Sequence, residues 1–309
     1  MNRPTFSRWL GIGLLHSCCL WNVAIVWAQA PMPMQDAPAA GQGTAAAPQD
    51  LPPGMEQILQ TWEQHSAGMN RLEGSFQRYE YDSVFRVEKR AEGNYYYEAP
   101  DKGRMDFAPP KNMPNQPNTV GNIQFQVQGD IRQTWICTGD AILDVNHDQK
   151  TYNRVQIPAQ FQGENIVHSP LPFLFGMKAD DIKKRYLLAF GSMHDPAQGK
   201  VHIVAAPLMP AQQREYRRVE VLLNTQNFLP TAVKLFGTTD SKETVYVFTQ
   251  HTPRRLPWVP TSPFKSTYSN YTLLDDIKAP PESAQRMIPN GQFQRTAEGP
   301  QTTGRTQLR

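Results

Sequence analysis

The feature that most constrains the fold is an alternation of apolar and polar residues that recurs along the chain from Glu73 to Gln250. It appears first in EGSFQRYEYDSVF and continues through GNYYYEAP, GRMDFAPP, NIQFQVQG, RQTWICTG, AILDVNH and KTYNRVQIP. After a break it returns in RYLLAFG, KVHIVAAP, YRRVEVLLN, FLPTAVKLFG and ETVYVFTQ, and a last strand is expected around Ser266–Leu274. Short segments with a period of two, bounded by turn residues, predict strands of an antiparallel sheet.

Two helical segments accompany these strands. Four apolar residues from Met55 to Trp62 fall at i, i+3, i+4 and i+7, which predicts a helix with one apolar face that ends near Gly68. The second segment is Ser169–Tyr186 (SPLPFLFGMKADDIKKRY), where we expect a short apolar turn of helix and then a helix. The acidic residues at the start of that helix and the basic residues towards its end suit the helix dipole.

These elements predict a mainly β domain of the α+β class with about ten antiparallel strands. A flat open sheet of that size is unfavourable, so we expect it to curl. If helices cover the concave side, that side becomes an apolar trough. The candidates for its lining are the inward alternates Phe76, Tyr96, Phe107, Trp135, Leu143, Val221, Leu223, Val233, Leu235, Val245 and Val247. Ordinary core packing is the alternative explanation for each of them.

The N-terminus has the features of an export signal. Arg3 and Arg8 precede or flank the start of the apolar run Leu10–Ala28, and small or β-branched residues precede a cleavage after Ala28. Two alternatives stay open: the run could be retained as a membrane anchor, or Leu15–Cys18 (LHSC) could act as a lipoprotein box. We therefore expect an exported protein, periplasmic or secreted, with tethering to the membrane if the N-terminal segment is not cleaved.

The remaining composition defines the domain limits. Residues 29–53 are rich in Pro and Ala and predict a disordered tether after the signal peptide of residues 1–28. Residues 282–309 are polar, contain four arginines and predict a disordered tail. Residues 54–281 are left as a single domain.

The sequence offers little chemistry. A net charge of +3 without a basic cluster argues against nucleic acid as a partner. The chain has no G-x-S-x-G, H-E-x-x-H, Walker A or C-x-x-C motif, so we expect no enzyme, no metal site and no cofactor. Once a signal is removed, Cys137 is the only cysteine, and we interpret it as a small buried hydrophobic residue.

The densest group of ligand-type side chains lies in DVNHDQKTY (Asp144–Tyr152). Asn146, His147, Asp148 and Gln149 fall between two strand patterns, and Asn and Asp are residues that turns prefer. The stretch is therefore predicted to be a hairpin turn rather than a metal or acid–base site, with Asp144 on the solvent face.

The order of the segments resembles a known family. LEGSFQR, EGNYYYEAPDKGRMDF, TWICTGDAILDVNHDQKTYNRV, SPLPFLFG and NFLPTAVKLFGTTDSKETVYVF follow one another as in the outer-membrane lipoprotein carriers, the LolA-like proteins. The run SPLPFLFGMKADDIKKRY resembles an uncharacterised exported branch of that superfamily found in planctomycetes. The likeness spans roughly Met55 to Gln250, and it rests on the order and spacing of motifs that are individually weak.

The resemblance implies an incomplete, strongly curved β-barrel with a helical lid that holds lipid acyl chains. It adds Leu171, Phe173 and Leu174 of the SPLPFLFG motif to the candidate lining. One departure stands out: the carriers have a basic residue that helps to latch the lid before the proline of GxxYYxxP, and here that position is Ala99, before Pro100. Their release cycle therefore cannot be transferred to this chain.

Three functions follow in order of preference. The first is a non-enzymatic binding protein for a lipid or lipoprotein acyl chain. The second is a cell-envelope structural or interaction protein that keeps the fold and binds a protein partner without carrying lipid. The third, a hydrolase of an unrecognised type, would require His147 to cluster with His194 or another histidine around a cleft.

Overall fold

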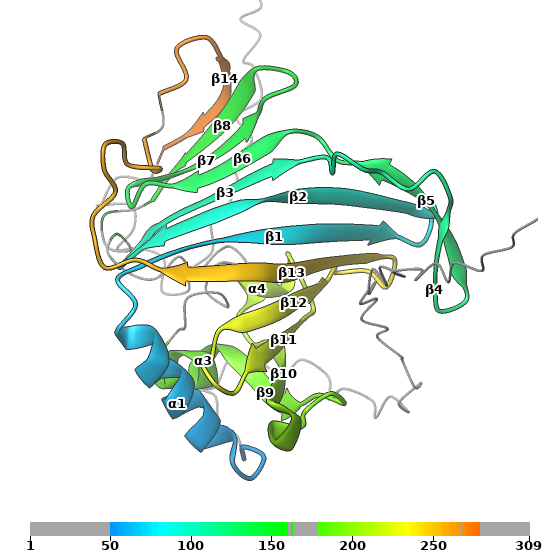
Figure 1. Cartoon of the computed structure of the whole chain (residues 1–309), viewed down its shortest axis with the longest axis vertical. Coiled ribbons are helices and arrows are strands. Elements are labelled where there is room, and N and C mark those ends of the chain that lie inside the picture. Colours follow the sequence, from blue (N-terminus) through cyan, green and yellow to red (C-terminus); the bar gives the residue numbers. More distant parts are fainter. Residues whose placement is uncertain (1–49, 158, 160–161, 163–177, 266, 279–309) are drawn as a thin grey trace, which may run out of the picture. The chain divides into compact units, whose positions relative to one another are not determined.

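A computed structural model of the chain describes residues 50–157, 159, 162, 178–265 and 267–278 (Figure 1). The signal peptide, most of the tether and the tail fall outside these residues, so their boundaries stay predictions. The described strands form one sheet in the order β14-β8-β7-β6-β3-β2-β1-β13-β12-β11-β10-β9, with β5 beside β2 and β4 beside β5. The strands are β1 (Arg71–Asp82), β2 (Val87–Glu98), β3 (Lys102–Ala108), β4 (Asn118–Val120), β5 (Ile123–Gly129), β6 (Gln133–Cys137), β7 (Ala141–Asn146), β8 (Thr151–Gln156), β9 (Tyr186–Phe190), β10 (Lys200–Pro207), β11 (Arg218–Asn224), β12 (Pro230–Phe236), β13 (Lys242–Pro253) and β14 (Thr272–Ile277).

The predicted fold class is confirmed: the sheet is large, strongly curved, mainly antiparallel and not closed into a barrel (Figure 1). The structure has more strands than the ten or so predicted, and two of its pairings are parallel, β14 with β8 and the start of β2 with β5. β4 has only three residues and showed no alternation in the sequence. The last strand was expected around Ser266–Leu274, and the structure places β14 at Thr272–Ile277, with all six residues exposed.

Helix α1 (Met55–Ala67) confirms the first predicted helix, and it ends at Gly68 as expected. Its apolar face buries Met55, Leu59 and Trp62. Helix α3 (Ala179–Arg185) confirms the second, and the apolar turn predicted before it lies outside the described residues. Two shorter pieces complete the described helical content, the 3-10 turn η2 (Pro196–Gln198) and helix α4 (Pro210–Gln213).

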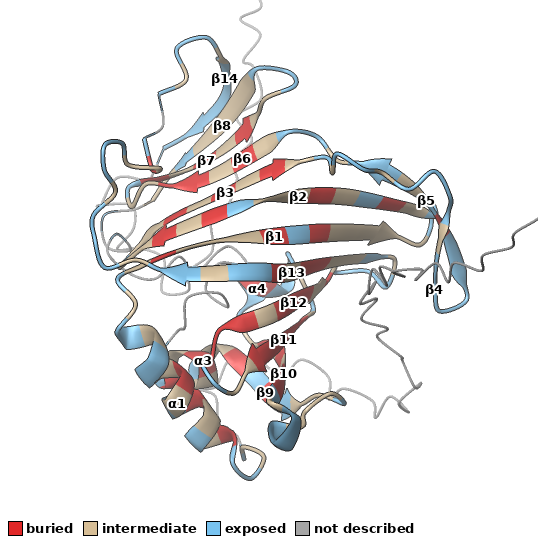
Figure 2. Cartoon of the chain, viewed as in Figure 1, coloured by how far each residue is buried: buried red, intermediate tan, exposed pale blue. Residues whose placement is uncertain are grey.

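Both faces of the sheet bury apolar side chains. The larger cluster joins α1 and α3 to the concave face of strands from β9 round to β6. A smaller cluster of Ile136, Ala141, Leu143 and Val145 lies on the outer face of β6 and β7. Buried positions therefore follow a strict period of two in β3 but not in β2 and β10–β12 (Figure 2).

The outer face is covered in part by a strap, which we define as residues 254–265 and 267–271. The strap starts where the Arg254 guanidinium donates to Glu73 of β1 and lies 4.7 Å from the Trp258 ring. Trp258 in turn packs on Tyr96 of β2 at 5.8 Å between ring centroids. Further along, the Arg104 side chain donates to the Pro263 carbonyl. The strap continues into β14, which pairs with β8 at the sheet edge.

The predicted turn in DVNHDQKTY is confirmed. The Asn146 side-chain oxygen accepts hydrogen bonds from the backbone N–H groups of Asp148 and Gln149, as Asn does in turns. Asp144 differs from the prediction. It lies opposite Trp135 in the ladder, on the concave face, where it accepts a hydrogen bond from Gln133 at 2.6 Å.

His147 reaches from this turn to the strap. Thr134 donates its only hydroxyl hydrogen to Asp106 at 2.7 Å. The hydroxyl oxygen therefore accepts a hydrogen bond from His147 Nε2, which lies 2.7 Å away. His147 Nδ1 is left to accept from the Tyr271 hydroxyl at 2.9 Å. Burial lowers the pKa of His147, which favours this neutral ring. Its hydrogen bonds thus hold strap and sheet together.

A close approach in β1 requires glycine. Gly74 lies opposite Tyr95 of β2, next to a register shift between β1 and β13. A Cβ atom at this position would lie 2.0 Å from the Gln250 carbonyl oxygen and 2.6 Å from the Tyr95 ring. The missing side chain therefore leaves room for Tyr95 to lie across β1.

We expect Gly74→Ala to lower the free energy of unfolding by about 2 kcal/mol, because the new methyl group overpacks a site that includes backbone. Gly68→Ala is the matched control, since a Cβ there would meet nothing within 4 Å and its φ of −83° is ordinary. Chemical denaturation of both variants tests this. Equal stability of the two variants would contradict the close approach.

Candidate functional site

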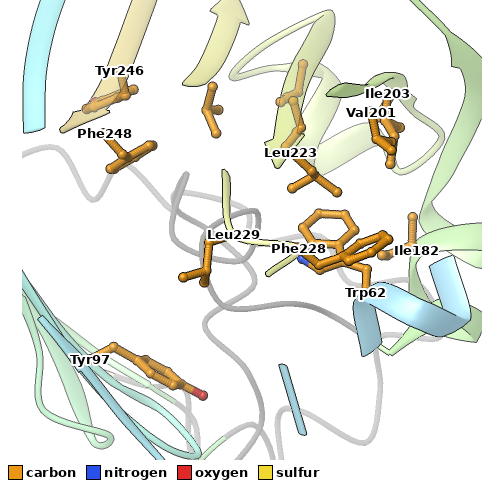
Figure 3. Close-up of a cluster of buried hydrophobic side chains, with 14 of the residues drawn as sticks. Trp62, Tyr97, Ile182, Val201, Ile203, Leu223, Phe228, Leu229, Tyr246 and Phe248 are labelled. Atoms are coloured by element: carbon orange, nitrogen blue, oxygen red, sulfur yellow. The ribbon is translucent and has the colours of Figure 1, made fainter. Parts of the chain in front are cut away.

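The concave face of the sheet carries the largest apolar surface that the described residues build. Figure 3 labels ten of its side chains. They come from helices α1 and α3 (Trp62, Ile182), from β2 and β13 (Tyr97, Tyr246, Phe248), from β10 and β11 (Val201, Ile203, Leu223) and from the turn after β11 (Phe228, Leu229). All ten are at most 9% exposed.

A row of aromatic rings crosses the middle of this face. Phe76 lies 5.1 Å from Phe107 and 6.4 Å from Phe248, measured between ring centroids. Phe107 packs edge-on against Trp135 at 4.7 Å, and Phe248 packs edge-on against Tyr95 at 5.7 Å. Five strands contribute one ring each, in a geometry that aromatic pairs favour. The face is therefore continuous and apolar from β13 to β6.

A buried ion pair flanks the row. Arg78 and Asp130 form a salt bridge with side chains only 5% and 7% exposed. The guanidinium carbon lies 4.3 Å from the Phe107 ring centroid and 5.6 Å from that of Trp135. Burial acts to lower the pKa of Arg78, but Tyr246 and Asp130 outweigh it and raise the pKa. The arginine thus stays charged and neutralised beside the aromatic row.

A second polar group near the concave face is the ring of His251, which forms hydrogen bonds through both of its nitrogens. His251 Nε2 lies 2.8 Å from the Pro230 carbonyl oxygen, which only accepts, so this nitrogen donates. The other ring nitrogen, Nδ1, then accepts from the Tyr95 hydroxyl. Burial lowers the pKa of His251 below its ordinary 6.5, against an opposing effect of the Pro230 carbonyl. The structure therefore holds His251 neutral.

The helices that cover part of this face are tied to each other. Lys183 of α3 donates to both carboxylate oxygens of Glu56 of α1, at 3.0 and 3.1 Å. Glu63 of α1 accepts a hydrogen bond from the backbone N–H of Ala179, the first residue of α3. We name α1 and α3 together the lid. Its charged contacts lie at the surface and hold the two helices as a pair.

The sequence candidates divide into three groups. Seven lie on the concave face or pack against its cluster: Phe76, Phe107, Trp135, Val221, Leu223, Val233 and Leu235. Four lie on the outer face: Tyr96, Leu143, Val245 and Val247. Leu171, Phe173 and Leu174 lie outside the described residues.

The four candidates on the outer face were misplaced for two reasons. Tyr96, Val245 and Val247 have apolar neighbours in their strands, so the alternation does not show which residues face inward. Leu143 alternates with polar Asp144, but its buried side is the outer face. The structure turns Tyr95, Tyr97, Tyr246 and Phe248 inward instead. Tyr96 and Leu143 are covered by the strap, which had no recognisable signal in the sequence.

Other residues of the concave face were not among the sequence candidates. Phe228 and Leu229 belong to a turn in which Phe228 has a φ of +52°, whereas the sequence pattern placed them at the start of a strand. The Phe228 ring stacks on His65 of α1 at 5.1 Å. Trp62 of α1 carried a signal, the apolar helix stripe, but the stripe alone does not show which surface it covers.

By sequence, the chain matches no family model and no curated protein. Solved structures similar to it include an uncharacterised conserved protein from Thermus thermophilus, with a TM-score of 0.39 and 8% identity over 71% of this chain and 98% of that one. A putative outer membrane lipoprotein-sorting protein domain from Vibrio parahaemolyticus gives 0.34 and 10%, covering 66% and 94%. A LolA superfamily protein from Nitrosomonas europaea gives 0.32 and 8%, covering 65% and 94%.

The architecture that the sequence motifs predicted, an incomplete and strongly curved barrel with a helical cover, is confirmed by the chain's own structure, in which a curved, unclosed sheet is partly covered by helices. The planctomycete branch stays a prediction.

The neutral His251 gives a pH prediction. Because its folded-state pKa is lowered, its contribution to stability is fully present above the ordinary pKa of 6.5 and is lost as the pH falls below that value. We expect His251→Gln, which is neutral at every pH and can still donate to Pro230, to lose less stability between pH 7 and pH 5 than the parent chain. Denaturation curves at both pH values measure this. An identical loss in the two proteins would contradict the burial of a neutral His251.

Proposed function

We propose that this chain is an exported, non-enzymatic binding protein that holds the acyl chain of a lipid or lipoprotein against the concave face of its sheet. The observation that carries the proposal is the continuous apolar face itself. Its aromatic row spans five strands, the buried ion pair beside the row is self-neutralised, and a two-helix lid packs on the same cluster. Such a face offers shape and apolar area rather than reactive groups.

The energetics of an acyl chain suit this face. Each buried methylene contributes about 0.8 kcal/mol, so a chain of about sixteen carbons offers roughly 10 kcal/mol before ordering costs. The side chains of the concave face are themselves almost fully buried by protein contacts. Entry of a ligand therefore requires the lid to move, and the Glu56–Lys183 pair is a surface contact that can break at little cost.

Export rests on the N-terminal sequence, with its basic residues and apolar run. Within the described part of the chain, no helix is both long and apolar enough to cross a membrane. A periplasmic or secreted location is part of the proposal, and a membrane tether through an uncleaved N-terminus is its alternative.

A second candidate is an envelope interaction protein that binds a protein partner without carrying lipid. It is favoured by Ala99, which replaces the basic residue of the carriers' latch, while the lid is tied by its own helix pair. The described residues give no support to the third hypothesis, a hydrolase. His147 is bonded to Thr134 and Tyr271 near one edge of the sheet, and His194 stacks on Phe190 at the other. The described residues contain no group of three or more side chains placed to hold a metal.

The test uses two neighbours on β11. Leu223 faces the concave cluster and Leu222 the outer face, and both are buried, so truncating either costs similar stability. We expect Leu223→Ser to weaken binding of a fluorescent fatty-acyl probe by about tenfold, the equivalent of about 1.4 kcal/mol. Leu222→Ser is expected to change it less than about twofold. Probe titration of both variants and the parent measures this.

Native mass spectrometry and lipid extraction of the purified chain supply an independent readout. Co-purifying acyl lipid that is lost in Leu223→Ser supports the proposal. A chain that binds no acyl probe, yet captures an envelope protein equally well with Leu222→Ser and Leu223→Ser, would replace it with the second candidate.

A further inference from the structure

We propose that a cleft on the outer face of the sheet binds a neutral saccharide. The cleft has a volume of about 420 Å³ and lies on the face opposite the aromatic row. It is lined by Gln77 and Tyr79 of β1, by Arg90 and Glu92 of β2, and by Pro110–Asn112 of the loop after β3. Its size falls within the range of small-ligand sites. This site is independent of acyl-chain binding.

The cleft has one rigid wall. The Arg90 Nε donates to Glu88, which is fully buried and also accepts from Asn118. The Arg90 guanidinium lies 5.4 Å from the centroid of the Tyr79 ring. Tyr79 in turn donates its hydroxyl hydrogen to Gln77 at 2.9 Å. Supporting contacts of this kind fix polar groups before a ligand arrives, which reduces the entropic cost of binding.

The rest of the lining offers polar groups without hydrogen-bond partners in the described part of the chain. Among the described residues, the side chains of Glu92, Lys111 and Asn112 make no hydrogen bond or ion pair. Glu92 supplies acceptors, Lys111 supplies donors and Asn112 supplies both. A sugar hydroxyl donates and accepts at the same time, so it is satisfied where donors and acceptors stand side by side.

The charges favour a neutral ligand. Arg90 is neutralised by the buried Glu88 behind the lining, and the other two charged lining residues, Lys111 and Glu92, have opposite signs. An anion would lie close to the Glu92 carboxylate, and an acyl chain would leave the polar groups of the lining without partners. A neutral polyhydroxylated ligand avoids both costs, and Tyr79 provides a ring for its apolar C–H face.

The experiment titrates the purified chain with maltotriose and with chitotriose, followed by amide NMR shifts. We expect at least one of them to bind with a dissociation constant on the order of 1 mM, as suits a small open site. Replacing both Glu92→Ala and Asn112→Ala is expected to weaken that binding at least about tenfold. Asn94→Ala is the matched control, because Asn94 is exposed on the same face of β2 outside the cleft, and it should change binding less than about twofold.

Circular dichroism and the acyl-probe titration check that the double variant remains folded and keeps its concave face. Binding of neither trisaccharide would overturn the proposal. So would sugar binding that the double variant leaves unchanged, or binding of glucuronate in place of both neutral sugars.

Discussion

A single sheet with two apolar faces is the constraint on which the rest of the structure depends. A strand that is solvated on one side needs only one covering layer, but here the concave side packs on the lid and the outer side of β6 and β7 packs on the strap. Removing either cover would expose side chains that the sheet alone cannot bury. The helices at residues 55–67 and 179–185 and the strap after β13 are thus parts of one packing solution, although they are far apart in sequence.

This constraint also explains how much of the fold could be predicted from the sequence. Alternation and turn residues placed most strands, the helix stripe placed α1, and the turn at residues 146–149 was predicted correctly. The side of the sheet that an individual side chain faces was harder to predict. In VYVF of β13, four apolar residues follow one another, and only the packing in the structure shows that Tyr246 and Phe248 face the concave cluster. The strap could not be predicted, because Trp258, Tyr268 and Tyr271 are spaced irregularly between polar residues and prolines.

The two faces also separate two kinds of surface chemistry. On the concave side the central charged and titratable groups are paired: Arg78 forms a salt bridge with Asp130, and both ring nitrogens of His251 form hydrogen bonds. On the outer side, next to the loop after β3, polar side chains that make no hydrogen bond or ion pair among the described residues remain around a cleft. A surface whose charges are paired accepts apolar contacts at lower cost, whereas one with free donors and acceptors favours polar contacts. The division arises because each strand presents alternate residues to opposite sides.

The position of β1 in the middle of the sheet has a consequence for biogenesis. Its neighbour β13 is joined to it across more than 170 positions, as the hydrogen bond between Ser75 and Thr249 shows. The first strand made therefore waits for one of the last before it is paired on both sides, and contacts of such long range form slowly. A chain of this topology cannot complete its sheet while it is still being synthesised. Its central strands thus stay incompletely paired until the last ones have been made, which is the condition that the proposed export would require.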